Sequence, residues 1–187
     1  AAAHSESIPI CLIVNKIDLE GALKEIEPLC QVYQKWNYEL FFISAKHAIG
    51  LERLVDKLNS PSIKLAAFAG VSGVGKSTLL NKLIPNASQR IREVSERTGQ
   101  GRQTTSQTIA HLFARPEGAP LLIADLPGIQ SFGVSHLDKL SVAQGFPEIM
   151  QYTKGCRFSN CSHIREQECG VRAAVERGEI SESRYES

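Results

Sequence analysis

Residues 70–78 read Gly70-Val71-Ser72-Gly73-Val74-Gly75-Lys76-Ser77-Thr78. An apolar run over residues 63–69 precedes this stretch, and apolar residues at helical spacing follow it over residues 79–84. The glycines let the backbone curl so that successive N–H groups point at one anion, and the following helix adds its N-terminal dipole. A strand, a G-x-x-x-x-G-K-S/T loop and a helix together predict a phosphate-binding loop for a nucleoside triphosphate.

The last residues of this loop have predicted roles in chemistry. The Lys76 ammonium is placed to reach the β- and γ-phosphates, and we predict it to be catalytic. The Ser77 hydroxyl is a predicted Mg²⁺ ligand, and all residues of 70–78 are predicted to bind nucleotide. The alternative is a glycine-rich turn before an ordinary helix, which would carry none of these roles.

The bulk properties of the chain narrow its class. A length of 187 residues permits one ordinary domain with a small appendage, and 22% charged with 42% hydrophobic residues is a globular composition. Because the net charge is only +1, a polyanionic partner has to be held by a local patch. Apolar runs fall far short of the roughly 20 residues that cross a bilayer, so we expect no membrane partner.

A second motif ends the first predicted strand. Residues 8–14 form an apolar run that predicts a strand buried on both faces, and Asn15-Lys16-Ile17-Asp18 follows it. Open α/β sheets bind ligands at this edge. The Asp18 carboxylate can accept hydrogen bonds from the N1–H and the N2 amino group of guanine, a pair that adenine lacks. We expect Asn15 to bond the other edge of the base and the Lys16 stem to lie against its ring.

Both motifs have rivals. Asp18 alone is equally consistent with a helix cap, and a phosphate loop alone is consistent with an ATP-using kinase or ATPase. Together they favour guanine. The next predicted elements are a helix over residues 23–38 disturbed at Pro28, a strand over residues 40–43 and a helix over residues 50–58. Between the last two stands Ser44-Ala45-Lys46, whose backbone N–H is expected at guanine O6, while Cys11 and Cys30 are expected in the core.

The region after the phosphate loop supplies the remaining predicted contacts. Residues 90–107 are polar, with a glycine-rich centre. Thr104 and Thr105 could each supply a hydroxyl to Mg²⁺ in a nucleotide-dependent switch, and we predict Thr105 as the Mg²⁺ ligand and a catalytic residue. The alternative is a charged loop without a switching role. Residues 108–115 and 121–124 predict a hairpin with its turn at residues 117–120. It ends in Asp125-Leu126-Pro127-Gly128, in which Asp125 would hold the Mg²⁺ shell and the Gly128 N–H would contact the γ-phosphate.

A cluster of metal-binding residue types lies near the C-terminus. Its members are Cys156, Cys161, His163 and Cys169. Three thiolates and an imidazole are the ligands of a structural, tetrahedral Zn²⁺ site, and a segment with few large apolar residues needs such a staple. The spacing differs from that of a two-histidine finger, and reduced cysteines beside a surface histidine are the alternative. We expect residues 170–185 to be helical and to pack on this site.

The order of the motifs is permuted. In an ordinary small GTPase the phosphate loop comes first and N-K-x-D late, whereas here N-K-x-D and S-A-K precede it, a rearrangement that neighbouring termini permit. On residues 15–18, 70–78, 101–105 and 125–128 and the cysteine cluster, the chain resembles the circularly permuted RsgA (YjeQ) GTPases of small ribosomal subunit assembly. The resemblance implies an α/β P-loop GTPase domain with a three-layer, mostly parallel sheet at residues 1–135. A zinc-binding helical domain at residues 136–187 would follow.

The resemblance also implies an activity. It implies a monomer that hydrolyses GTP to GDP and phosphate, with the small ribosomal subunit and its rRNA as partner and activator, in the cytoplasm or, in a plant, the chloroplast stroma. Ile129 occupies the position after D-x-x-G where many GTPases use glutamine to orient water, so we expect slow basal hydrolysis. The rival is a zinc-stapled RNA-binding module whose GTP site only switches affinity.

Three features depart from the family pattern. Gln103 replaces the histidine of G-R-H-T-T, and Leu126 replaces the threonine of D-T-P-G. Members of the family also carry an N-terminal OB-fold domain and a further strand–helix unit before N-K-x-D. We therefore expect a fragment that lacks one central strand, between residues 63–69 and 8–14, and that has an incomplete core.

Overall fold

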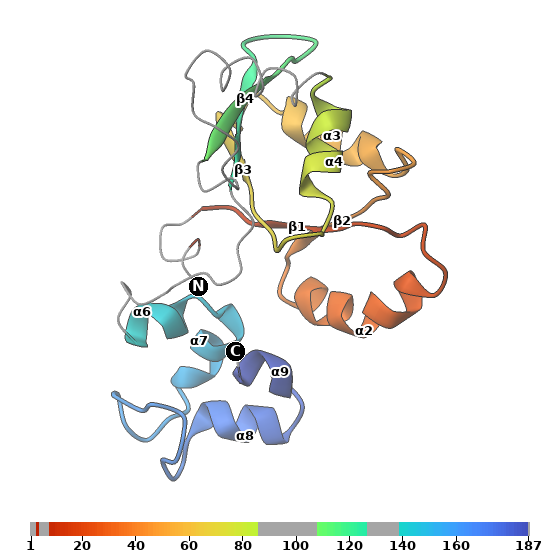
Figure 1. Ribbon diagram of the computed structural model, residues 1–187. Coiled ribbons are helices and arrows are strands. Elements are labelled where there is room, and N and C mark those ends of the chain that lie inside the picture. The colour runs from red at the N-terminus through yellow and green to blue at the C-terminus, as the bar shows by residue number, and fades with distance from the viewer. Residues whose placement is uncertain (1–2, 4–7, 86–107, 127–138, 187) are drawn as a thin grey trace, which may run out of the picture. The chain divides into compact units, whose positions relative to one another are not determined.

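The computed structural model describes residues 3, 8–85, 108–126 and 139–186 (Figure 1). The chain divides into two units. Unit 1 comprises Ala1–Leu12, Ile26–Glu39 and Gly133–Ser187, and unit 2 comprises Ile13–Glu25 and Leu40–Phe132. Residues 133–187 thus share a unit with residues 26–39. The predicted domain boundary at residue 135 stays a prediction.

The N-terminal region is a strand, a helix and a strand. Strand β1 (Cys11–Val14) and strand β2 (Glu39–Phe42) form a two-stranded sheet and are joined by helix α2 (Ala22–Lys35), which continues through Pro28. Beyond β2, Ile43 N–H donates to the Val14 carbonyl and the Ile43 carbonyl accepts from Ile17 N–H. These bonds tie residues 15–18 to the end of β2.

Two expectations for this region are wrong. Strand β1 is only half-buried and Cys11 is exposed, whereas Cys30 on α2 is buried as expected. A fully buried strand needs a paired strand along each edge and packed elements on each face. Among the described residues, β2 is the one strand that pairs with β1, so the other edge of β1 is left open.

A second sheet contains three strands in the order β3 (Leu65–Phe68), β5 (Leu121–Asp125) and β4 (Ile109–Phe113). Strand β5 runs parallel to β3 and antiparallel to β4, which confirms the predicted hairpin. The register sets Asp125 opposite Phe68, and Leu126 N–H donates to the Phe68 carbonyl. The acidic end of β5 therefore lies beside the strand that leads into the phosphate loop.

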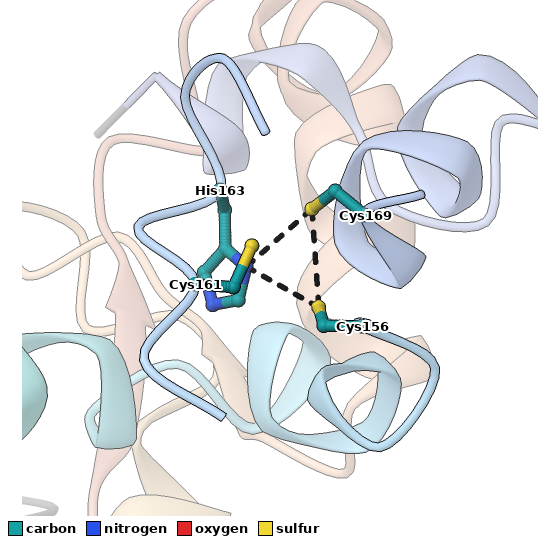
Figure 2. A group of neighbouring side chains, drawn as sticks. All are labelled: Cys156, Cys161, His163 and Cys169. Carbon is teal, nitrogen blue, oxygen red and sulfur yellow. Dashed lines mark hydrogen bonds between the residues drawn. The ribbon is translucent and has the colours of Figure 1, made fainter. Parts of the chain in front are cut away.

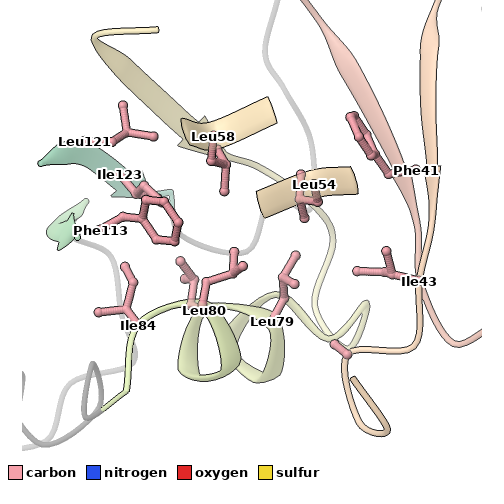
Figure 3. Close-up of a cluster of buried hydrophobic side chains, with 12 residues drawn as sticks. Phe41, Ile43, Leu54, Leu58, Leu79, Leu80, Ile84, Phe113, Leu121 and Ile123 are labelled. Atoms are coloured by element: carbon pink, nitrogen blue, oxygen red, sulfur yellow. The ribbon is translucent and has the colours of Figure 1, made fainter. Parts of the chain in front are cut away.

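Two helices cover one side of these strands. Helix α3 (Leu51–Asn59) and helix α4 (Lys76–Leu83) are packed into a single hydrophobic core that both sheets share (Figure 3). Its members include Ile43, Leu54, Leu58, Leu79, Leu80, Leu83, Leu121 and Ile123. Each such side chain stabilises the fold by about 1.5–3 kcal/mol on full burial. This core fixes both ends of the phosphate loop, since the loop connects β3 to α4.

The opposite face of the three-stranded sheet carries an apolar row. The strand register aligns Leu65, Leu122 and Leu112 across the three strands, and all three side chains are exposed. Among the described residues, β1 and β3 belong to separate sheets. The fold is thus mixed α/β with two small sheets, and the three-layer, mostly parallel sheet stays a prediction.

The C-terminal part is helical. It contains α6 (Lys139–Gln144), α7 (Pro147–Thr153), α8 (Gly170–Glu176) and α9 (Glu182–Tyr185), with a small core of Cys169, Val171, Ala174 and Ile180. The single helix expected over residues 170–185 is instead two, because the chain turns at Gly178 with a φ of 70°. None of the helices in the described ranges has the length and apolarity that crossing a bilayer requires.

Candidate nucleotide and metal sites

Asn15 joins the loop of residues 15–18 to two other loops. Its side-chain Nδ2 donates to the Val74 carbonyl at 2.8 Å, and its Oδ1 accepts from the backbone N–H of Ala45 at 2.9 Å and of Lys16 at 2.8 Å. Both ends of the amide are therefore used by protein backbone. Asn15 holds residues 15–18, 44–46 and 70–78 together, and its contact with a base stays a prediction.

Lys16 makes a second link. Its Nζ donates to the Gly73 carbonyl at 2.8 Å, so the aliphatic stem spans the gap between the two motifs. Lys16 also has a φ of 67°, in the left-handed region that non-glycine residues rarely adopt. Strained residues of this kind cluster where function fixes the backbone.

Asp18 is held as an ionised acceptor. A hydrogen bond from Ser44 lowers the pKa of its carboxyl most strongly, desolvation opposes this, and His47 and Lys46 add further lowering. The His47 Nε2 lies 3.6 Å from Asp18 Oδ2. Ser44 and Ala45 are buried, whereas Lys46 is exposed. Sequence reasoning missed His47, although its position directly after S-A-K was a usable signal.

The phosphate loop brings Lys76 to the end of β5. Lys76 Nζ lies 2.8 Å from Asp125 Oδ1 and also donates to the Leu126 carbonyl. Ser77 and Thr78 follow in the first turn of α4, and Val71, Ser72 and Val74 are exposed in the loop. A cation, a carboxylate and a helix N-terminus are thus gathered where phosphates and Mg²⁺ would bind. Thr105, Gln103, Gly128 and Ile129 lie outside the described residues.

Replacing Gly75 by alanine is expected to weaken nucleotide binding by up to about 10-fold, since loss of the hydrogen bond from Asn15 to Val74 costs about 0.5–1.5 kcal/mol. Gly75 has a φ of 91°, and a Cβ there would lie 2.3 Å from Asn15 Nδ2, so Asn15 must move. Titration with a fluorescent guanine nucleotide measures the loss. Gly73→Ala is the matched control, because its φ is 82° but nothing lies within 4 Å of the added atom. Equal losses in both variants would show that backbone strain, and not Asn15, is responsible.

The four predicted metal ligands converge in unit 1 (Figure 2). Cys156 Sγ and Cys169 Sγ are 3.9 Å apart, and His163 Nδ1 lies 3.6 Å and 3.5 Å from them. With Cys161 Sγ included, all four ligand atoms lie within 4.8 Å of one another. Ideal tetrahedral Zn²⁺ coordination separates two sulfurs by about 3.8 Å and a sulfur from a nitrogen by about 3.6 Å. The observed spacing therefore fits a tetrahedral ion.

The protonation energetics of the cluster also favour a cation. Burial raises the pKa of the Cys156 thiol, but hydrogen bonds from the backbone of Val171 and Gly170 outweigh it, so the pKa lies below its usual value. Burial and the neighbouring thiols raise the pKa of Cys161 to about 11. Burial lowers the pKa of His163, which favours the neutral imidazole that ligates metals. Three negatively charged thiolates repel one another at this spacing, and a metal ion offsets that repulsion.

Glu166 organises the loop between the ligands. Its two oxygens accept from Ser162 N–H, Ser162 hydroxyl, Ile164 N–H and Arg165 N–H at 2.5–3.0 Å. These bonds, the Ser162 hydroxyl first, lower the pKa of Glu166 to about 2. Because the folded-state pKa is depressed, this stabilisation is complete above the ordinary carboxyl pKa near 4.5 and is lost as the pH falls through about 2.

Glu166→Gln is therefore expected to lower metal affinity by about 10-fold, the lower end of typical effects of residues that orient metal ligands. The amide nitrogen cannot accept the bonds that one carboxylate oxygen accepts. Competition with a chromophoric chelator gives the affinity. Glu168→Gln is the control, since the Glu168 side chain forms an exposed pair with Arg157, the kind of pair that contributes little. Unchanged metal affinity in Glu166→Gln would mean that the loop holds its shape without this carboxylate.

Known proteins resemble this chain throughout. Residues 1–135 match the RsgA GTPase family. A Haemophilus influenzae protein named small ribosomal subunit biogenesis GTPase RsgA is 38% identical over 94% of this chain and 49% of its own length. A Pseudomonas putida relative of the same name is 39% identical, and the match covers 100% of this chain and 53% of the relative's length. The chain thus spans about half the length of these relatives.

Solved structures agree. YjeQ from Thermotoga maritima superposes with a TM-score of 0.73 at 32% identity, over 99% of this chain and 59% of that one. YloQ, described as a circularly permuted GTPase, gives a TM-score of 0.64 at 25% identity. The match covers 94% of this chain and 53% of YloQ. The permuted order of motifs is therefore confirmed, and the chain belongs to the RsgA GTPase family.

Proposed function

We propose that this chain is the nucleotide-hydrolysing and metal-binding part of a factor in small ribosomal subunit assembly. The observation that carries the proposal is the pair of links from Asn15 to Val74 and from Lys16 to Gly73, which join the guanine motif to the phosphate loop. GTP would bind across residues 15–18, 44–46 and 70–78. Asp18 reads the guanine N1–H and N2 amino group, which gives selectivity over ATP.

The hydrolysis mechanism follows from the groups at the end of β5. Lys76 exchanges Asp125 and the Leu126 carbonyl for the β- and γ-phosphate oxygens and stabilises their developing charge. Ser77, Asp125 and Thr105 would hold Mg²⁺, which neutralises phosphate charge when bound. The Gly128 N–H would contact the γ-phosphate. Since the Ile129 side chain has no donor or acceptor to orient the attacking water, basal hydrolysis is slow until a partner completes the site.

The metal site and the architecture form part of the same proposal. Zn²⁺ at Cys156, Cys161, His163 and Cys169 is structural, because four protein ligands leave no open position. The GTPase domain ends near residue 135, and its complete form is a three-layer sheet with one more strand between β3 and β1. The separation of the two sheets and the exposed row of Leu65, Leu122 and Leu112 support this.

The partner is proposed from the relatives' name. A monomer without membrane attachment, in the cytoplasm or in a chloroplast stroma, would act on the small ribosomal subunit and its rRNA. The test is GTP hydrolysis by the full-length protein with isolated small subunits, large subunits or neither, and with ATP as the nucleotide control. We expect strong stimulation by small subunits with GTP only. Full-rate hydrolysis without subunits would contradict the proposal, and subunit binding without turnover would favour an RNA-binding module whose GTP site only switches affinity.

A further inference from the structure

Helix α9 presents two consecutive side chains to different parts of unit 1. The Tyr185 hydroxyl donates to the His163 carbonyl at 2.5 Å, so it holds the backbone of a metal-ligand residue. Arg184, the preceding residue, lies over the ring of Tyr33, with its guanidinium carbon 5.2 Å from the ring centroid. Tyr33 belongs to α2, the helix that follows Asp18 in the sequence.

Arg184 is enclosed by charge and by aromatic rings. Its Nε donates to Glu148 Oε1 at 2.5 Å, and its guanidinium carbon lies 4.7 Å from the centroid of Phe146. Glu148 is fully buried at 0% exposure, and the Arg184 side chain is 13% exposed. A buried carboxylate needs a paired cation. Moving Arg184 away would therefore leave the Glu148 charge buried and uncompensated.

A second contact fixes the same region of α2. Lys35 Nζ, in the last turn of α2, donates to the Glu179 carbonyl at 2.9 Å, just before α9. The C-terminal half of α2 is thus held by Arg184 of α9 and by Glu179 just before it, whereas Tyr185 of α9 contacts the metal loop, residues 156–169. Pro28 lies inside α2, where it removes one intrahelical hydrogen bond, so the C-terminal half depends more on such tertiary contacts.

We propose that α9 fastens the metal loop to the C-terminal half of α2, with Arg184 as the positioning residue, so that metal loading orders this end of α2. Without metal the ligands separate and Tyr185 loses its fixed acceptor at His163. Arg184, one residue away on the same short helix, is then displaced from Tyr33, and the buried Glu148 loses its paired cation. The inference rests on the proposed Zn²⁺ site but needs neither GTP nor a ribosomal partner.

Hydrogen exchange read by mass spectrometry tests this on the full-length protein, with Zn²⁺ loaded and after chelation. In the wild type, amides of residues 26–38 are expected to exchange about 10-fold or more slowly with Zn²⁺ than without it, as for other locally opening units. Arg184→Met should bind one Zn²⁺, and with Co²⁺ in its place should give the tetrahedral absorption bands, yet exchange rapidly over residues 26–38 in both states. Arg53→Met is the control, because Arg53 lies exposed on α3 in unit 2, and this variant should behave as the wild type.

Tyr185→Phe covers the case in which Arg184→Met does not fold. It removes one hydroxyl and should keep the metal while lowering the metal-dependent protection of residues 26–38. Protection that does not depend on Zn²⁺ in the wild type would overturn the inference, as would full metal-dependent protection in both Arg184→Met and Tyr185→Phe. Either outcome would leave GTP binding and hydrolysis untouched, so it is distinct from failure of the proposed function.

Discussion

An Asp18→Asn variant is expected to bind GTP at least about 100-fold more weakly and to gain affinity for xanthosine triphosphate. In the proposed complex the ionised carboxylate accepts two hydrogen bonds from guanine, each worth about 1.5–3 kcal/mol when one partner is charged. An asparagine amide still accepts from N1–H, but its NH₂ group faces the guanine amino group, which is also a donor. In xanthine that amino group is replaced by a carbonyl oxygen, which the same NH₂ can bond.

Competition binding with GTP, xanthosine triphosphate and ATP measures this exchange of specificity. Asp56→Asn is the matched control, because Asp56 lies exposed on α3 and away from the loops that carry the motif. The hydrogen bond from Ser44 that keeps Asp18 ionised remains available to asparagine, so the loop should hold its shape. Wild-type GTP affinity in Asp18→Asn would contradict the assignment of this residue to the base.

Loss of the metal ion is expected to unfold the segment around α7, α8 and α9. The core of this segment consists of Cys169, Val171, Ala174 and Ile180, which is too small to stabilise a fold by itself. Structural Zn²⁺ binding contributes about 10–16 kcal/mol that is coupled to folding. A Cys169→Ser variant should therefore lose one equivalent of zinc and most of the helical signal of this segment.

Metal analysis, circular dichroism and guanine-nucleotide titration together check this prediction. Cys169 also caps α8, since its sulfur accepts from Arg172 N–H at 3.4 Å, so the substitution removes a ligand and weakens a helix start. Guanine-nucleotide binding should persist, because residues 15–18, 44–46 and 70–78, which we propose to bind the nucleotide, lie in unit 2. Cys11→Ser is the control for thiol removal, since Cys11 is exposed and is no ligand. Stoichiometric zinc and an unchanged melting transition in Cys169→Ser would contradict the metal site.

Local patterns predicted the parts of the fold that depend on local chemistry. The glycines and Lys76 of the phosphate loop, the end of β5 at Asp125 and the four metal ligands all follow from residue type and spacing. The prediction that β1 is buried on both faces was wrong, because burial depends on neighbouring elements that no local pattern encodes. The break between α8 and α9 was missed, although Gly178, which has a φ of 70°, is a residue type that ends helices and was a usable signal.

Contacts between side chains far apart in the sequence could not be predicted, for a similar reason. Glu148 reads as a solvent-facing charge in a short helix, yet it is buried against Arg184 from far along the chain. The hydrogen bonds by which Asn15 joins three loops were also missed, because an amide that suits a base suits backbone carbonyl and N–H groups equally well. What the sequence lacks in each case is the partner, which only the tertiary fold supplies.

In the proposed function, residues 15–18, 44–46 and 70–78 form one guanine-nucleotide site. Titrating the isotopically labelled full-length protein with Mg²⁺ and GDP, and following backbone amide shifts by NMR, tests it most directly. We predict that amides in all three segments shift with a single dissociation constant and that ADP leaves them unchanged. Shifts confined to residues 70–78, or an equal response to ADP, would contradict the account.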